Sequence, residues 1–195
     1  MCKAGSFYLW ILQLIVLLAI LALGLWLTLT PKNPTFTIVE LTLPSSKNSS
    51  AGTDNQDGTI SYTLEISNPS KDSTVYYDEI LLVFYFGQDL IGNNKIPAFE
   101  QGKGDKIQKS NHVDANDKKV GRAISDGISK GKADLKVDLA TKIKYKTWGV
   151  KSKHHEVKLE AEIPVGSDGK ILGKKKHIQL RNPSKKWKLR ANKFL

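Results

Sequence analysis

One cluster of side chains in this sequence resembles a metal site: His154-His155-Glu156. On a strand, His154 and Glu156 would point to the same face, because successive side chains alternate between the two faces. A zinc site needs at least three protein ligands, and the basic neighbourhood of this cluster offers no third ligand. We therefore predict a surface turn at these residues and no bound metal.

The segment around Asp54 and Asp57 resembles a calcium-binding loop, because Gly58 follows the two carboxylates. An EF-hand loop places glycine at its sixth position and oxygen ligands at its first and twelfth positions. With Gly58 at the sixth position, the first residue is Thr53 and the twelfth is Leu64, and neither is a carboxylate. The segment is therefore expected to be a polar loop without a metal.

The sequence also lacks the usual signs of phosphate binding and of nucleophilic catalysis. Gly102-Lys103-Gly104 lies in a polar segment without the strand-to-helix context that a phosphate-binding loop requires. Neither the serines nor the single cysteine, Cys2, has an identifiable general base. We therefore predict a protein that is not an enzyme and that binds no cofactor.

A candidate for covalent modification is Asn48, which begins the N-glycosylation sequon Asn48-Ser49-Ser50. The triplets that begin with Asn68 and Asn182 have proline in the middle position and are excluded. The residues around Asn48 are rich in Ser, Asn, Gly and Asp, which is typical of an exposed loop. We predict that Asn48 carries a glycan if this part of the chain lies outside the cell.

Among the elements that must position these residues, the first is a long apolar segment, residues 7–29. It contains no charged residue, and Gln13 is its only strongly polar side chain. As a helix it would reach roughly 34 Å, which is enough to cross the ~30 Å hydrocarbon layer of a bilayer. Tyr8, Trp10 and Trp26 lie near its ends, where aromatic rings favour the headgroup region. We predict a transmembrane helix.

A cleaved signal peptide is the alternative interpretation of this segment. Lys3 supplies a basic start, and the small residues Ala22 and Gly24 offer a cleavage position. The apolar run continues past that position to Leu29, which favours a retained anchor. The charges of Lys3 and the α-amino group on one side, against Lys32 on the other, give only a slight preference for orientation.

Basic side chains are concentrated towards the C-terminus. The net charge is +11, and residues 166–195 contain ten Lys and Arg against a single acidic residue, whereas residues 30–165 are nearly balanced. Contact with an anionic surface, either lipid headgroups or an acidic polysaccharide, is one interpretation, and a solvated end is the other. Beside a membrane anchor, a nucleic-acid patch is disfavoured. The basic residues singled out are Lys174, Lys175, Lys176, Lys185, Lys186, Lys188 and Arg190.

The remainder of the chain shows the alternation that is typical of strands. Residues 35–43 are expected to form the first strand, with a bulge near Ile38-Val39 where the alternation shifts phase. Residues 60–67 alternate cleanly between apolar and polar side chains, which is typical of a half-buried strand. Residues 44–58 are predicted to be a polar loop between the two strands.

The most apolar stretch after the anchor is residues 74–86, predicted to be one central strand that is covered on both faces. A turn around Gln88-Asp89, bracketed by Gly87 and by Gly92-Asn93-Asn94, is expected to follow. After it, residues 100–132 are expected to be polar and mostly irregular. The alternation of apolar and polar residues also predicts strands with one solvent-exposed face over residues 133–146 and 157–165. About six to eight antiparallel strands indicate an all-β fold, an antiparallel β-sandwich preceded by one transmembrane helix.

The predicted organisation has five parts. They are a short cytoplasmic segment (1–6), the transmembrane helix (7–29), a stalk (30–34), the β-sandwich (35–181) and a basic tail (182–195).

Three short motifs follow the apolar segment in a characteristic order: Asn68-Pro69, Tyr76-Tyr77-Asp78 and Pro97-Ala98-Phe99-Glu100-Gln101. In this arrangement the chain resembles the plant non-race-specific disease resistance and harpin-induced protein family, which carries a group 2 late-embryogenesis-abundant domain. Residues 139–169 most resemble the disease-resistance member, and the resemblance as a whole extends over residues 7–181.

The resemblance implies a fibronectin- or immunoglobulin-like sandwich at the plasma membrane, outside the cell. It implies a role in immune signalling and in contact between wall and membrane, with a plasma-membrane immune regulator or an acidic cell-wall polysaccharide as partner. The disease-resistance member is thought to use an Asn-Gly-Asp adhesion tripeptide. This chain departs from it, with Gly166-Ser167-Asp168 at the comparable turn and the similar Lys103-Gly104-Asp105 elsewhere.

The predicted function is that of a non-catalytic, membrane-anchored protein of plant defence signalling, which binds other proteins or cell-wall polymers. One alternative is a dehydration or stress protectant of membranes that has no specific partner. A lipid carrier or an enzyme is a further alternative, and it would require a hollow sandwich core.

Overall fold

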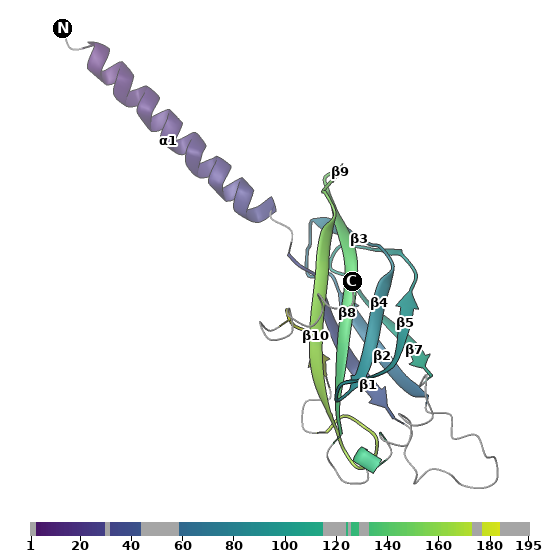
Figure 1. Cartoon of the computed structure of the whole chain (residues 1–195). Helices are drawn as coiled ribbons and strands as arrows, with labels where there is room; N and C mark the ends of the chain where they lie inside the picture. The colour runs from purple at the N-terminus through teal and green to yellow at the C-terminus, as the bar shows by residue number, and fades with distance from the viewer. Residues whose placement is uncertain are drawn as a thin grey trace. The chain divides into compact units, whose positions relative to one another are not determined.

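The computed structural model describes residues 3–29, 32–43, 59–114, 124, 126–128, 133–172 and 177–183 (Figure 1). The chain divides into two compact units, Met1–Lys32 and Asn33–Leu195. The first unit holds the helix α1, and the second holds the strands β1 to β11.

Helix α1 (Lys3–Leu29) consists almost entirely of apolar residues and begins somewhat before the predicted start at Phe7. Its 27 residues correspond to about 40 Å at 1.5 Å rise per residue. Between Phe7 and Leu25 the mean hydropathy is 2.5, and none of this stretch is buried. An apolar surface around the whole circumference is typical of a membrane span or a signal sequence.

The first sheet has four strands in the order β11-β1-β2-β7, and every pairing is antiparallel. The register between β1 and β2 shifts between Ile38 and Glu40, which confirms the predicted bulge. Because the bulge interrupts the alternation, Ile38 and Val39 are both buried. The strands are β1 (Thr35–Thr42), β2 (Ile60–Ser67), β7 (Lys106–Val113) and β11 (Ile178–Gln179).

The second sheet is organised around its longest strand, β8 (Ala133–Thr147). β10 pairs with one edge of β8, while β4 and β3 pair one after the other with its opposite edge. The remaining pairings join β5 to β4, β6 to β3 and β9 to β8. The bounds are β3 (Ser73–Tyr77), β4 (Ile80–Phe86), β5 (Asp89–Ile96), β6 (Phe99–Gln101), β9 (Val150–Lys151) and β10 (His155–Val165).

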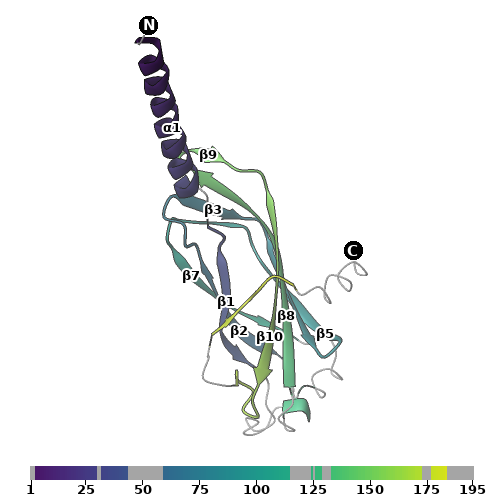
Figure 2. The same cartoon turned by 90° about the vertical axis from the view of Figure 1, so that its left-hand side faces the viewer.

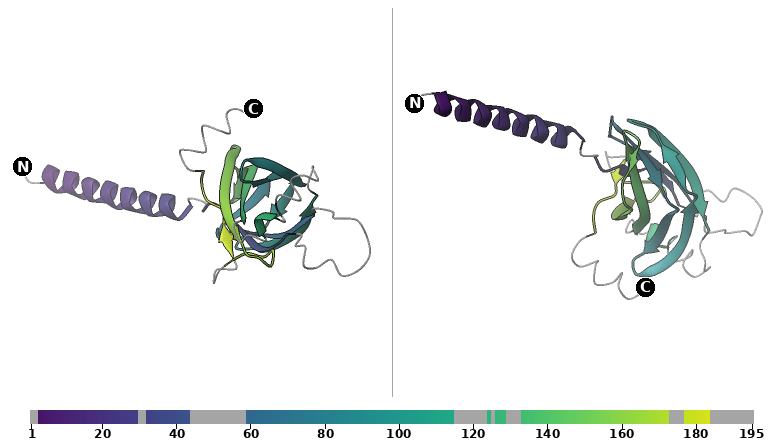
Figure 3. Two further views of the ribbon diagram at one scale, coloured as in Figure 1. Left: turned by 60° about the horizontal axis from the view of Figure 1, so that its bottom comes forward. Right: turned by 90° about the horizontal axis from the view of Figure 1, so that it is seen from above.

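The two sheets face each other and enclose the core, as the views in Figures 2 and 3 show. Aromatic rings occupy its centre: Phe36 and Tyr77 meet edge to face with centroids 6.0 Å apart, and Tyr62 and Phe84 lie 5.0 Å apart. All four side chains are buried, and burial of such large apolar surfaces is the main driving force for folding. The predicted all-β antiparallel sandwich is confirmed.

Short links close both edges of the sandwich. Beyond β11, Arg181 and Glu160 of β10 exchange two backbone hydrogen bonds of 2.7 and 2.9 Å, so that one segment joins both sheets. At the other edge, Asn94 Nδ2 of β5 donates to the carbonyl of His112 in β7 at 2.9 Å. A Cβ atom on Gly92 would lie 2.8 Å from the carbonyl oxygen of Asp114, so this edge requires glycine.

The prediction of one strand over residues 74–86 is wrong. β3 ends at Tyr77 and β4 begins at Ile80, because the two strands pair with different halves of β8. At the junction the Asp78 amide donates to the carbonyl of Lys142 at 2.9 Å. β4 is also not covered on both faces, since its outward side chains are only half-buried.

The turn predicted around Gln88-Asp89 is present between β4 and β5, at Gly87 and Gln88. It is shorter than predicted, because β5 already begins at Asp89 and Gly92-Asn93-Asn94 lies within that strand, where Gly92 allows the close approach to β7. The prediction of a mostly irregular segment over residues 100–132 is wrong, because this segment contains the end of β6 and the whole of β7. β7 is mostly exposed at its sheet edge, so its polar composition conceals it, and the same segment contributes the buried residues Ile124 and Ile128 to the core.

Candidate functional site

The predicted glycosylation site and basic cluster lie outside the described residues. Asn48 falls in the sequence between β1 and β2. Its glycosylation remains a prediction. The basic residues outside the described part of the chain are Lys174, Lys175, Lys176, Lys185, Lys186, Lys188 and Arg190.

The His154-His155-Glu156 cluster is divided among three separate contacts. His154 Nε2 lies 3.6 Å from Asp78 Oδ2, and both side chains are half exposed. The His155 ring packs against Tyr145 with centroids 5.8 Å apart, while Glu156 pairs with Lys158 at 3.6 Å. Within the described part of the chain, no three His, Cys, Asp or Glu side chains lie where they could hold a metal ion.

Gly166-Ser167-Asp168 forms a tight turn after β10. The Gly169 amide donates to the Gly166 carbonyl at 3.0 Å, and Asp168 Oδ1 accepts from the Lys170 amide at 3.1 Å. Gly169 has a φ of +74°, and its carbonyl accepts from the Leu43 amide at 2.9 Å. The Asp168 carboxylate therefore stabilises the turn itself.

The Asn68-Pro69 motif builds a buried polar junction between the two sheets. Asn68 follows β2 of the first sheet and is fully buried. Its Nδ2 donates to the carbonyls of Ser73 and Gly102, each at 2.8 Å, and its Oδ1 accepts from the Ser70 amide at 3.0 Å. One side chain thus satisfies three backbone groups. These hydrogen bonds hold the segment between β2 and β3 against the segment that follows β6.

The other two motifs meet at the same junction. Tyr77 Oη donates to Gln101 Oε1 at 2.7 Å, and Gln101 Nε2 donates to the carbonyls of Ile66 and Asp105, each at 2.9 Å. The rings of Tyr77 and Phe99 stack with centroids 4.6 Å apart. Burial raises the pKa of the Tyr77 hydroxyl well above its usual range, because the ionised form would lose its solvation.

The three motifs that suggested the family therefore converge on one network, Asn68, Tyr77 and Gln101, which joins the sheets. Its buried side chains have no access to solvent, so its role is to position strands and not to bind a ligand. Sequence reasoning missed this contact, because the three residues are separated by up to 33 positions and lie in different strands and turns.

This network lies at one end of the sandwich, which we call the stalk end. It comprises Asn33 and the turns at residues 68–72, 102–105 and 147–150, brought together by the registers Thr35–Ser67, Ser67–Lys106 and Ser73–Thr147. Tyr145 Oη donates to Asn33 Oδ1 at 3.0 Å. Residues 68–72, 102–105 and 146–153 are basic, because they contain five exposed lysines against Asp72 and Asp105. These are Lys71, Lys103, Lys146, Lys151 and Lys153.

The strand that precedes the basic tail, β11, runs in the direction of the stalk end. Ile178 lies opposite Ile38 and Gln179 opposite Thr37, so the C-terminal strand runs towards the start of β1. The Leu180 amide continues this course by donating to the Phe36 carbonyl at 2.9 Å. Residues 178–180 therefore run towards the start of β1, and Arg181 then pairs with Glu160 in the middle of β10.

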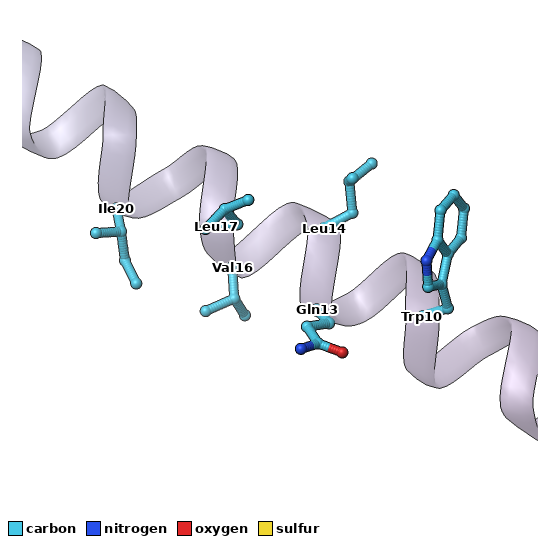
Figure 4. A pocket seen from close by; sticks show the side chains of 6 residues that line it. All are labelled: Trp10, Gln13, Leu14, Val16, Leu17 and Ile20. Atoms are coloured by element: carbon cyan, nitrogen blue, oxygen red, sulfur yellow. The ribbon is translucent and has the colours of Figure 1, made fainter.

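A hollow on helix α1 is lined in part by Gln13, the only strongly polar side chain of the apolar segment. Figure 4 shows that its lining residues project from one helix into open space. Gln13 lies among apolar neighbours and makes this stretch of the helix less uniform than the rest. The lining residues are Trp10, Gln13, Leu14, Val16, Leu17 and Ile20. The hollow is a surface groove of the helix and not an enclosed binding site.

Comparison with known proteins defines the class of this protein. Residues 63–161 match the family described as late embryogenesis abundant protein, and the matched part runs from β2 into β10. The chain therefore belongs to the late embryogenesis abundant family, and its similarity to the proteins below places it in the NDR1/HIN1-like group. The predicted family is confirmed.

Three relatives from Arabidopsis thaliana support this placement. The chain is 29% identical to Protein NDR1 over 181 residues, which cover 88% of this chain and 80% of that protein. It is 31% identical to NDR1/HIN1-like protein 26 over 77 residues (39% of this chain, 36% of that protein). It is 26% identical to NDR1/HIN1-like protein 2 over 158 residues (76% and 65%).

Among solved structures, the solution structure of AT1g01470 from Arabidopsis thaliana matches 70% of this chain and 85% of its own, with 17% identity and a TM-score of 0.43. The similarity to Protein NDR1 suggests a defence-related late embryogenesis abundant protein of plants. Proteins of this family and these relatives are not known as enzymes.

Proposed function

We propose that this protein is a single-pass plasma-membrane protein of plant defence signalling with its β-sandwich outside the cell. Residues 1–6 would face the cytoplasm, residues 7–29 would cross the membrane, and residues 35–181 would form the extracellular domain. The observation that carries the proposal is the similarity to Protein NDR1, which covers 88% of the chain. The sandwich would act without catalysis, by binding a membrane protein or a cell-wall polymer.

The surface of α1 supports membrane insertion. Its stretch from Phe7 to Leu25 has no buried residue, and water would be in contact with apolar side chains on every side. A helix satisfies its own backbone hydrogen bonds, so that the hydrocarbon layer is a suitable environment for it. A signal sequence would share these properties, and the fate of the segment after Gly24 separates the two interpretations.

The second candidate function is protection of membranes during dehydration, without a specific partner. The family match to late embryogenesis abundant proteins is the observation that favours it. A transcript induced by water loss and not by pathogen signals would support this candidate. Induction by pathogen signals, together with a defined partner in a pull-down from membranes, would support the defence function.

The proposed topology predicts that the sandwich and Asn48 are accessible from outside. Protease added to intact protoplasts should remove the sandwich, and an amidase that cleaves N-glycans should increase the mobility of the wild type. The Asn48→Gln variant is the control and should show no mobility shift, because it lacks the sequon. An undigested sandwich, or a mature N-terminus at Leu25, would contradict the proposed topology.

The basic tail is proposed to bind an acidic cell-wall polysaccharide. The purified sandwich, residues 33–195, should bind polygalacturonate at low salt and release it at high salt, since the Debye length falls from ~10 Å at 0.1 M to ~3 Å at 1 M. Truncation after Pro183 should remove most of this binding while leaving the hydrogen bonds of Leu180 and Arg181 in place. Co-sedimentation over a salt series measures the effect.

A matched pair of variants separates the tail from general surface charge. Lys185→Gln with Lys186→Gln should weaken binding to polygalacturonate. Lys95→Gln with Lys158→Gln removes the same charge from the outer face of the second sheet, where both lysines pair with glutamates, and should have little effect. Equal loss in the two variants, or full binding after truncation, would show that the tail is not the binding element.

A further inference from the structure

The β8–β9 hairpin exposes two large apolar side chains at its tip. Trp148 is 75% exposed and Val150 is 73% exposed, more than any other large apolar side chain in the described part of the sandwich. The pairing of Thr147 with Val150 places both residues at the turn. An apolar pair that is this exposed gains nothing from the core, so burial within the domain does not explain it.

The turn itself does not require tryptophan. Trp148 has a φ of +52° and Gly149 a φ of +86°, which is the pattern of a type I′ hairpin turn. Asparagine followed by glycine is the preferred sequence there, because a positive φ is unfavourable for a bulky residue. Trp148 therefore occupies a position where a smaller residue would stabilise the turn better.

Lysines surround the exposed tip. Lys146 pairs with Lys151 across the hairpin, and Lys153 follows two residues later; all three are exposed. The Lys151 ammonium lies 5.2 Å from the centre of the Tyr76 ring. Within the described part of the chain, no ion pair is formed by these three lysines. Their charges are therefore available to anionic groups of a partner.

The hairpin also contacts the first residue of the sandwich unit, Asn33. Tyr145, in the same hairpin, donates to Asn33, and Asn33 is only four residues after Leu29, the last residue of α1. Four extended residues span at most about 14 Å. If α1 crosses the membrane, as proposed above, the stalk end and its hairpin must stay close to the bilayer surface.

We propose that the tip of the β8–β9 hairpin inserts into the headgroup layer of the membrane that α1 crosses. This inference rests on the proposed membrane anchor. Trp148 and Val150 would enter the interface, where an indole ring has both an apolar surface and a hydrogen-bonding partner. Lys146, Lys151 and Lys153 would contact lipid phosphates, so anionic phospholipids are the preferred surface. The contact would fix the orientation of the sandwich on the membrane.

The test uses the full chain in vesicles that contain anionic and zwitterionic phospholipids, with Cys2→Ser as background. Val150→Cys carries an environment-sensitive fluorophore at the tip. Gln88→Cys is the matched control, because it lies in the exposed β4–β5 turn at the opposite end of the same sheet. The label at position 150 should show blue-shifted emission and quenching by headgroup spin labels, and the label at position 88 should show neither.

Two further measurements keep the outcomes distinct. Flotation after carbonate extraction reports insertion of α1, so that a protein that does not float contradicts the proposed anchor itself. In protein that floats, an unquenched label at position 150 overturns the hairpin inference. Trp148→Ser, and Lys146→Glu with Lys151→Glu, should each reduce the quenching at position 150 while circular dichroism shows an intact β fold. Unchanged quenching in both variants would also overturn it.

Discussion

Replacing Asn68 by alanine is expected to lower the free energy of unfolding of the sandwich by about 3 kcal/mol. The side chain makes three hydrogen bonds to buried backbone groups, and Ala removes all of them at once. The Ser73 and Gly102 carbonyls and the Ser70 amide then lose a partner in a region that water reaches poorly. Urea unfolding of residues 33–195, followed by far-ultraviolet circular dichroism, measures the loss.

Asn94→Ala is the matched control for this prediction. Asn94 also donates from Nδ2 to a backbone carbonyl between strands, but its single bond to His112 is exposed. Water replaces the lost partner there, so the expected loss is about 0.5–1 kcal/mol. Similar losses for the two variants would show that the buried junction contributes no more than an ordinary surface contact.

Replacing Asp138 by asparagine is expected to stabilise the sandwich at neutral pH and not at acidic pH. Asp138 lies on the outer face of β8, and partial burial raises the pKa of its carboxyl from 3.8 to about 7. The neighbouring Glu160 raises this pKa further, and Lys136 lowers it. The native state therefore keeps a proton that the unfolded chain has already released between these two pH values.

The sign of the pH dependence follows from this difference. Below pH 3.8 the Asp138 carboxyl is protonated in both the native and the unfolded state, and it does not destabilise the native state. As the pH rises towards 7, the unfolded state releases this proton more readily than the native state, so the free energy of unfolding falls. Because Asp138 is only partly shielded from solvent, screening limits the expected gain of Asp138→Asn at pH 8 to about 1–2 kcal/mol. Urea unfolding at pH 4 and pH 8 measures it.

Asp134→Asn provides the control, since Asp134 is exposed on the same strand and the same face. Its stability difference from the wild type should not change with pH in this way. A constant gain for Asp138→Asn at all pH values would instead indicate a change in packing. If the sandwich lies outside the cell, the wild type would become more stable as its surroundings acidify.

The local patterns of the sequence determined several elements by themselves. Within a hydrocarbon layer, a single apolar segment can satisfy its own backbone hydrogen bonds only as a helix, and α1 ends at Leu29, where the apolar run ends. In β2, the alternation of Ile60, Tyr62, Leu64 and Ile66 with polar residues places the apolar set in the core. Such elements depend on near neighbours along the chain, so their physics is visible in the sequence.

Other features were decided by contacts between distant segments. β7 is largely polar because it lies at an exposed edge, and it is a strand because β2 pairs with it along its whole length. The break between β3 and β4 arises because β8 pairs with each of them in turn. Pairing energy therefore overrides the local composition in both cases.

The candidate sites also differ in whether the sequence alone or only the tertiary structure determines them. Asn48 and the basic tail follow from a sequon and a run of like charges, which are properties of neighbouring residues. The junction of Asn68, Tyr77 and Gln101 exists only because the two sheets close on each other, and Trp148 is exposed only because the hairpin places it beyond the core. The tertiary structure decides which side chains meet and which face solvent, because these contacts join residues that are far apart in the sequence.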